Sequence, residues 1–124
     1  MKSILLVEDD PFLVDIYTTK LKKAGFSVEV AEDGEKVFKK LKEKVPDLVV
    51  LDIVLPHIDG WEILRKIKEN EKFKDLKLLI LSNLGQKEEI EKGLSLGAIK
   101  YLIKAHYTPS KLVEEIKKII EPNA

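Results

Sequence analysis

The sequence of 124 residues contains no cysteine, which excludes disulfide bonds and metal sites built from thiolates. It also has no surplus of positive charge, because Lys plus Arg and Asp plus Glu both number 22 and the formal net charge is zero. Proteins that bind nucleic acid usually carry a basic excess. We therefore expect no direct binding of nucleic acid.

Long apolar stretches are missing as well. No uninterrupted apolar run approaches the roughly 20 residues that a membrane span needs. Only residues 4–7 are apolar before the first acidic cluster, and this run is too short for the core of a signal peptide. These absences predict a cytoplasmic protein without a membrane partner, and the length suits one domain over residues 1–124.

Short apolar runs alternate with helical patterns along the whole chain. The runs predict strands at 3–7, 27–31, 47–51, 76–82 and 99–103. Apolar residues at helical spacing predict helices at 12–24, 34–44, 61–70, 87–96 and 109–120. This alternation favours parallel strands with right-handed crossovers, and so an α/β fold: a doubly wound five-stranded parallel sheet with helices on both faces.

Polar side chains follow four of the predicted strands. They are Glu8, Asp9 and Asp10 after the first strand, Asp52 after the third, Ser82 after the fourth and Lys104 after the fifth. In such sheets ligands bind beyond the carboxyl ends of the strands, where these residues should meet. Crowded carboxylates repel one another unless a cation lies among them, and oxygen ligands without His or Cys favour Mg²⁺.

Several of these residues also have an ordinary structural interpretation. Asp10 precedes Pro11, and taken alone it is better explained as a helix N-cap, although this leaves Asp9 unexplained. Asp52 is harder to dismiss, because an ionised carboxylate in the apolar run LVVLDIVLP needs either a wet edge or a partner of opposite charge. Chance placement of polar residues at the ends of four strands explains the pattern less well than a shared site does.

Four motifs, ILLVEDDP, DLVVLDIVLPHIDGWEIL, ILSN and GAIKYLIK, together resemble the response-regulator receiver domain of two-component signalling. The resemblance covers essentially the whole chain and implies a flavodoxin-like three-layer sandwich. It implies that Asp52 accepts a phosphoryl group from a phosphohistidine on a sensor histidine kinase or a phosphotransfer protein. Mg²⁺ would be held by Asp9, Asp10 and Asp52, with the backbone carbonyl of Val54 as a further ligand.

The same resemblance assigns roles to three more residues. Ser82 would hydrogen-bond the phosphoryl oxygens and Lys104 would pair with them. Tyr101 resembles the family's switch aromatic, whose ring can turn into the space that Ser82 vacates; a half-buried strand aromatic is an equally good interpretation. The chain would catalyse its own phosphorylation and signal to an unknown downstream protein through its fourth helix, fifth strand and fifth helix, with a phosphorylation-dependent homodimer as one option.

Other classes of protein fit less well. A haloacid-dehalogenase-type phosphatase needs a second Asp two residues after the nucleophile, where this chain has Val54, and a dinucleotide-binding turn needs glycines that EDDPF lacks. The remaining alternative is a phosphorylation-independent receiver-like interaction module, but no acid, hydroxyl or lysine of the set is missing. The chain departs from the family at two places. Ala105 stands where the family has a cis proline, which predicts a trans bond after Lys104. Val54 and Leu84 are both apolar, which predicts a long-lived phosphorylated form.

Overall fold

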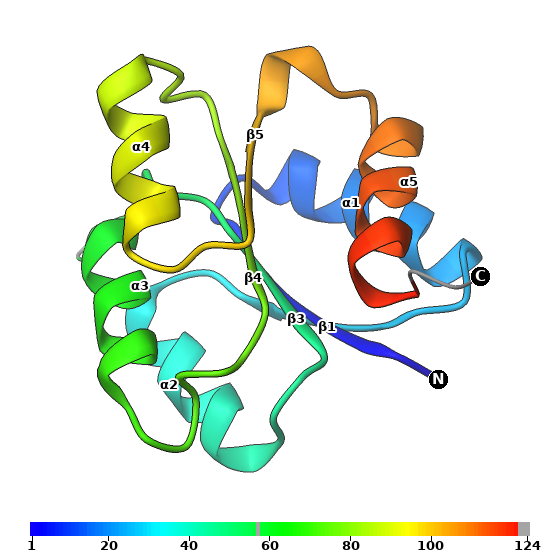
Figure 1. Ribbon diagram of the computed structural model, residues 1–124. Coiled ribbons are helices and arrows are strands. Elements are labelled where there is room, and N and C mark those ends of the chain that lie inside the picture. Colours follow the sequence, from blue (N-terminus) through cyan, green and yellow to red (C-terminus); the bar gives the residue numbers. More distant parts are fainter. Residues whose placement is uncertain (57, 122–124) are drawn as a thin grey trace.

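The computed structural model describes residues 1–56 and 58–121, within which strands and helices alternate as predicted (Figure 1). The strands are β1 (Ser3–Val7), β2 (Ser27–Ala31), β3 (Leu48–Leu51), β4 (Leu78–Ser82) and β5 (Lys100–Ile103). The helices are α1 (Pro11–Lys23), α2 (Gly34–Glu43), α3 (Gly60–Glu69), α4 (Lys87–Ser95) and α5 (Pro109–Ile120), with a 3-10 turn, η1 (Lys104–His106), after β5. Every predicted boundary lies within two residues of the observed one.

The five strands form one parallel sheet in the order β2-β1-β3-β4-β5. The last residues of neighbouring strands lie side by side, as Val7 pairs with Leu51 and Ser82 with Ile103. The carboxyl ends of the strands therefore meet at one edge of the sheet. The predicted doubly wound, flavodoxin-like three-layer sandwich is confirmed.

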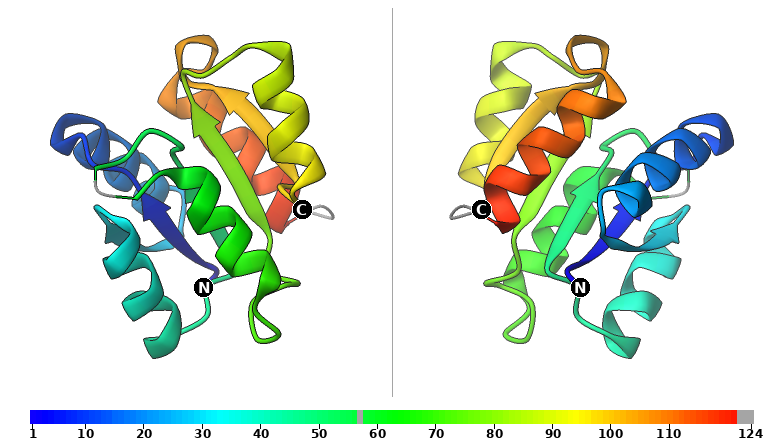
Figure 2. Two further views of the ribbon diagram at one scale, coloured as in Figure 1. Left: turned by 90° about the vertical axis from the view of Figure 1, so that its left-hand side faces the viewer. Right: turned by 90° about the vertical axis from the view of Figure 1, so that its right-hand side faces the viewer.

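Helices cover both faces of the sheet, which explains why the inner strands β1, β3 and β4 are apolar without alternation. Figures 1 and 2 show α2, α3 and α4 on one face and α1 and α5 on the other. Successive side chains of β1 enter opposite cores: Leu5 and Val7 pack under α2, α3 and α4, whereas Ile4 and Leu6 pack under α1 and α5. The buried charged side chains in the described residues, Glu8 and Asp52, lie outside both cores, directly after the ends of β1 and β3.

Capping residues and glycines mark the ends of several helices. Asp33 accepts a hydrogen bond from Lys36 N at 3.0 Å and Thr108 accepts one from Lys111 N at 3.2 Å, so both are N-caps. Gly25 and Gly97 have positive φ angles of 96° and 114° and end α1 and α4. In the described ranges, no helix combines the length and the apolar composition that crossing a bilayer requires.

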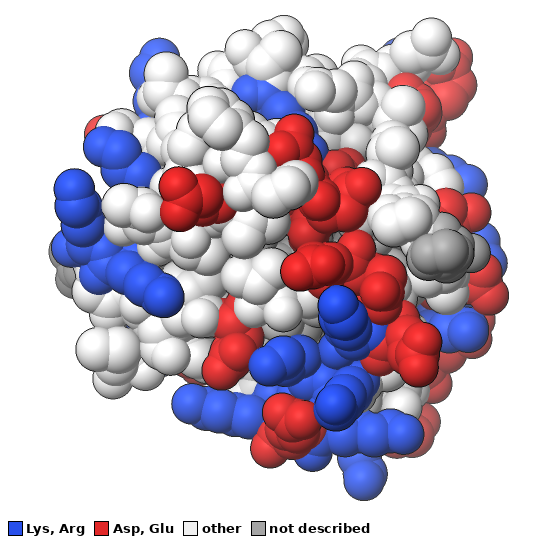
Figure 3. Space-filling view, turned by 180° about the vertical axis from the view of Figure 1, so that it is seen from behind, with Lys and Arg blue, Asp and Glu red and all other residues white. Residues whose placement is uncertain are grey.

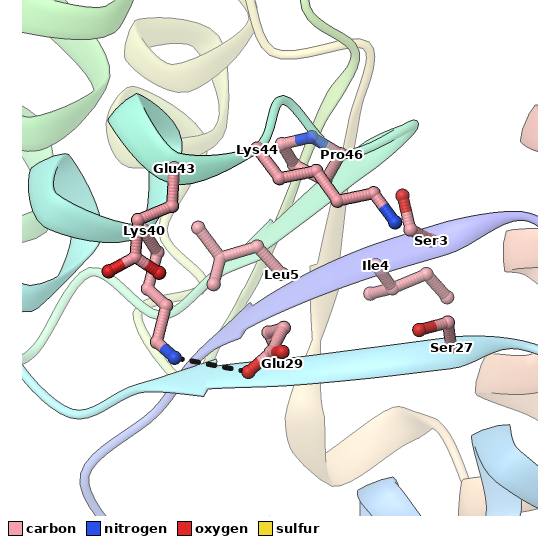
Figure 4. A pocket seen from close by; sticks show the side chains of 9 residues that line it. All are labelled: Ser3, Ile4, Leu5, Ser27, Glu29, Lys40, Glu43, Lys44 and Pro46. Atoms are coloured by element: carbon pink, nitrogen blue, oxygen red, sulfur yellow. Dashed lines mark hydrogen bonds and ion pairs between the residues drawn. The ribbon is translucent and has the colours of Figure 1, made fainter.

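A small hollow of about 80 Å³ lies at the opposite end of the strands (Figure 4). It is lined by the starts of β1 and β2 and by the end of α2, and an ion pair of 3.1 Å between Lys40 Nζ and Glu29 Oε2 lies beside it. Because it lies at Ser3 and Ser27, where the strands begin, it is separate from the polar residues at the strand ends.

Candidate functional site

Asp52 lies directly beyond β3, and only 6% of its surface is exposed. Its backbone N–H donates to the carbonyl of Val7 at 3.0 Å, which fixes it beside the end of β1. One carboxylate oxygen, Oδ1, accepts a hydrogen bond from Val54 N at 3.1 Å. The carboxylate is therefore held in one orientation, with Oδ2 left for another partner.

That partner is Lys104, whose Nζ lies 2.7 Å from Asp52 Oδ2 and 2.6 Å from Glu8 Oε1. Burial lowers the pKa of the Lys104 ammonium, but the hydrogen bonds and charges of Asp52 and Glu8 outweigh this effect and raise the pKa overall. Lys104 therefore remains a cation. Of the two options that the sequence left for Asp52, a wet edge or a partner of opposite charge, the structure shows the partner.

Glu8 was expected among the acids at the strand ends, but the family resemblance gave it no role of its own. Its side chain is 2% exposed, and Oε2 accepts hydrogen bonds from the backbone N–H groups of Asp9 and Asp10 at 3.1 and 3.2 Å. Burial raises the pKa of Glu8, and the bonds from Lys104 and the backbone only partly offset this. The alternation of side chains along parallel strands could have predicted the place of Glu8. Leu6 pairs with Val50, and the residues two positions further along, Glu8 and Asp52, therefore project on the same side of the sheet.

Three carboxylates, those of Glu8, Asp9 and Asp52, each place one oxygen within 4.8 Å of the others. Asp10 is not in this group; its Oδ1 instead accepts a hydrogen bond from Phe12 N at 2.9 Å and caps α1. The structure thus brings Asp9 to Asp52 as expected and places Glu8, rather than Asp10, beside them. A donor set made only of carboxylate oxygens suits a hard divalent cation such as Mg²⁺.

Charge is segregated on the surface although the total is zero. Seen from behind, acidic side chains gather in a band, and lysine and arginine side chains collect below it (Figure 3). Local fields of this kind concentrate counter-ions irrespective of net charge.

The loop after Asp52 is held tightly against the start of α3. Gly60 N donates to the carbonyl of Ile53 at 2.7 Å, and a Cβ on Gly60 would lie 2.4 Å from Ile53 Cα and 2.7 Å from the carbonyl oxygen of Asp52. Any side chain at residue 60 would force the two backbones apart. Glycine at this position therefore shapes the backbone around Asp52.

Ser82 and Tyr101 meet at the backbone of Leu84. Ser82 is fully buried, and its Oγ accepts a hydrogen bond from Leu84 N at 3.3 Å. The Tyr101 ring is buried on the α4 side of the sheet, and its hydroxyl donates to the carbonyl of Leu84. Burial and the nearby charge of Glu89 raise the pKa of this hydroxyl. The two residues are therefore linked through a single residue of the β4–α4 loop.

Ala105 gives the loop after Lys104 a hydrogen bond that proline could not make. The Lys104–Ala105 bond is trans, as predicted, since the described part of the chain holds no cis peptide. The N–H of Ala105 donates to Asn83 Oδ1 at 3.1 Å, and proline has no N–H to donate. The re-routed loop is thus tied to the β4–α4 loop, and Lys104 still reaches Asp52.

The arrangement of fold and site is that of a known family. The model of the response regulator receiver domain matches residues 4–117, and the chain belongs to this family. Receiver domains of two-component systems interact with histidine kinases or phosphotransfer proteins, and the family membership is consistent with a switch activated by phosphorylation.

Individual relatives and solved structures support this family assignment. The chain is 35% identical to the alkaline phosphatase synthesis transcriptional regulatory protein PhoP of Bacillus subtilis over 96% of its own length and 48% of PhoP. A receiver domain protein from Methanospirillum hungatei superposes with a TM-score of 0.89 at 28% identity, covering 98% of this chain and 95% of that one. The Mn²⁺-bound form of response regulator Rcp1 gives a TM-score of 0.86 at 26% identity, covering 100% and 98%. The chain spans about half the length of the curated relatives it matches.

Proposed function

We propose that this chain is a phosphorylation-activated signalling switch in which Asp52 accepts a phosphoryl group from the phosphohistidine of a sensor histidine kinase or a phosphotransfer protein. The observation that carries the proposal is the contact of 2.7 Å between Lys104 Nζ and Asp52 Oδ2 at the carboxyl edge of the sheet. Membership of the receiver family supports it.

The residues of the site suit transfer of a phosphoryl group. A carboxylate oxygen of Asp52 forms the new O–P bond as the P–N bond of the donor breaks, and the donor's imidazole leaves. Lys104 neutralises charge on the phosphoryl oxygens. Ser82 Oγ accepts from Leu84 N, which leaves its O–H to donate to a phosphoryl oxygen. The protein thus contributes alignment and charge, which is what this reaction needs.

Mg²⁺ is the cofactor that the carboxylate group would hold. We assign it to Asp9, Asp52 and the carbonyl of Val54, with Glu8 close enough to bind it directly or through water. Asp10, which the family resemblance implied as a ligand, caps α1 and is not assigned. When bound, the ion would offset the negative charge between carboxylate and phosphoryl oxygens. The Mn²⁺-bound form of response regulator Rcp1, a structural neighbour, supports binding of a divalent metal.

Two adjacent substitutions test this assignment. Asp9→Asn should weaken Mg²⁺ binding at least about tenfold because it removes a charged ligand. Asp10→Asn should leave the affinity nearly unchanged, because asparagine caps a helix as well as aspartate does. The titration is followed by the fluorescence of Trp61, the only tryptophan, which lies in the first turn of α3. Equal losses in the two variants would restore Asp10 as a ligand.

Phosphorylation itself is tested with acetyl phosphate and Mg²⁺. We expect the intact mass of the wild type to increase by one phosphoryl group, and neither Asp52→Asn nor the wild type in EDTA to change. A wild type that gains no mass under these conditions would favour the receiver-like module that works without phosphorylation.

The output surface is proposed to be the face formed by α4, β5 and α5. Tyr101 lies on β5 and contacts the β4–α4 loop, and Lys100 Nζ lies 2.6 Å from Glu115 Oε2, which connects β5 to α5. A change at Ser82 can therefore reach all three elements. The target is an unknown protein or a second, phosphorylated copy of the chain.

We expect the described domain not to bind DNA directly, because its net charge is zero. The relative PhoP is a transcriptional regulatory protein, but about half of its length lies outside the match. Any DNA binding in such a regulator would belong to that other half.

A further inference from the structure

Gly93 in the last turn of α4 is closely surrounded. It is buried, and a Cβ built on it would lie 2.6 Å from Ile80 Cδ1, 2.8 Å from Tyr101 Cδ2 and 3.2 Å from Tyr101 Cε2. Carbon atoms in contact normally stand about 3.5–4.0 Å apart. There is no room for even one methyl group between α4 and the Tyr101 ring.

The helix itself does not require glycine at this position. Among the described glycines only Gly25 and Gly97 have a positive φ, so Gly93, inside α4, has a helical backbone that any residue adopts. Glycine in a helix lowers stability relative to alanine, because it loses more conformational freedom on folding. The contact with Tyr101 and Ile80 accounts for a residue that otherwise weakens α4.

The two neighbours of Gly93 differ in how they could yield. Ile80 Cδ1 is the end of a flexible side chain and can move by a rotation about one bond. The Tyr101 ring is rigid, and its hydroxyl is bonded to the carbonyl of Leu84, so the ring must move as a whole. Helix α4 also contacts α3, because Lys92 Nζ lies 4.5 Å from the centre of the Trp61 ring.

We propose that Gly93 is a positioning residue for Tyr101: the missing side chain keeps the space in which the ring is buried, and so preserves the link from Tyr101 through Leu84 to Ser82. Filling that space displaces the ring towards solvent. A role of this link in signalling rests on the proposed function. The position of the ring does not, and it is measured in unphosphorylated protein.

The ring position is read from ¹⁹F NMR of protein labelled with 3-fluorotyrosine, with the Tyr101 resonance assigned by Tyr101→Phe. In Gly93→Ala the Tyr101 resonance should shift towards that of exposed fluorotyrosine, while those of Tyr17 and Tyr107 stay in place. Glu91→Ala, at an exposed position of the same helix, should leave all three unchanged. A Tyr101 resonance unmoved by Gly93→Ala would overturn the proposal.

A second measurement remains decisive if Gly93→Ala prevents folding. In an Ile80→Val background, which removes the contact at 2.6 Å, Gly93→Ala is made both with the native Tyr101 and together with Tyr101→Leu. We expect Gly93→Ala to lower the midpoint of unfolding, or abolish folding, when the tyrosine is present and to raise the midpoint when leucine replaces it. The same sign in both backgrounds, or no folding in either, would show that the ring is not what requires glycine.

Discussion

Glu8 Oε1 and Lys104 Nζ form an ion pair of 2.6 Å, with only 2% and 11% of the two side chains exposed. Asp52 contacts the same ammonium, so Lys104 is the positive charge between two buried carboxylates. Such an arrangement depends on the shared cation more than on either acid, because removing the cation leaves two like charges facing each other.

Lys104→Met should therefore cost about 3–5 kcal/mol of the free energy of unfolding at neutral pH in EDTA. The matched control is Lys100→Met, which also breaks a pair of 2.6 Å, with Glu115, but whose lysine is 43% exposed. Solvent screens that pair, and we expect a loss of no more than about 1 kcal/mol. Urea unfolding measures both, and similar losses would show that the pairs around Lys104 are no stronger than a surface contact.

Stability should depend on pH through Glu8. Burial raises its pKa above 4.5 in the folded chain, so the native state binds this proton more tightly than the unfolded state. The contribution of Glu8 to stability must then fall as pH rises from 4.5 through the folded pKa. Glu8→Gln cannot titrate.

The free energy of unfolding of Glu8→Gln, minus that of the wild type, should therefore increase over that range in EDTA. Urea unfolding at a series of pH values supplies this difference. A difference that decreases with rising pH would mean that Lys104 and the backbone N–H groups lower the pKa of Glu8 more than burial raises it.

Phosphorylation should alter the proposed output face. Hydrogen bonds connect Ser82, Leu84 and Tyr101. A change at Ser82 therefore shifts the equilibrium between conformations of the segment that contains them. Backbone NMR shifts after treatment with acetyl phosphate should cluster in residues 82–112 as well as around Asp52, and Asp52→Asn should show none of them. Changes confined to the loops around Asp52 would remove the output face from the account.

The phosphorylated form should be long-lived. Val54, which is 59% exposed, and Leu84, which packs against the core, offer no polar group to orient an attacking water. We expect Val54→Asn combined with Leu84→Glu to speed the loss of phosphoryl group after the donor is removed. Val45→Asn, at a similarly exposed valine outside the site, is the control. An unchanged decay would mean that these side chains do not control access of water.

The fold was predictable because burial leaves a periodic signal. Strands covered on both faces are continuously apolar, and helices carry their apolar residues at helical spacing, so even the element ends were correct to within two residues. The pairing of Asp52 with Lys104 was predictable for a different reason, since a buried charge requires a partner.

The details of the acidic group were not predictable from position alone. Glu8, Asp9 and Asp10 all follow β1, and which of them turns towards Asp52 depends on where α1 begins and which carboxylate caps it. The burial of Tyr101 likewise depends on the space at Gly93. The two residues lie on different elements, and no pattern in the sequence connects them.

The most direct test of the account is to locate the phosphoryl group. Borohydride reduces an acyl phosphate on aspartate to homoserine, which marks the modified residue permanently. After treatment of the wild-type chain with acetyl phosphate, Mg²⁺ and borohydride, peptide mass spectrometry should find homoserine at residue 52 alone, and none in a sample prepared with EDTA. Homoserine at Asp9 or Asp10, or its absence from residue 52, would contradict the assignment of Asp52 as the phosphoryl acceptor.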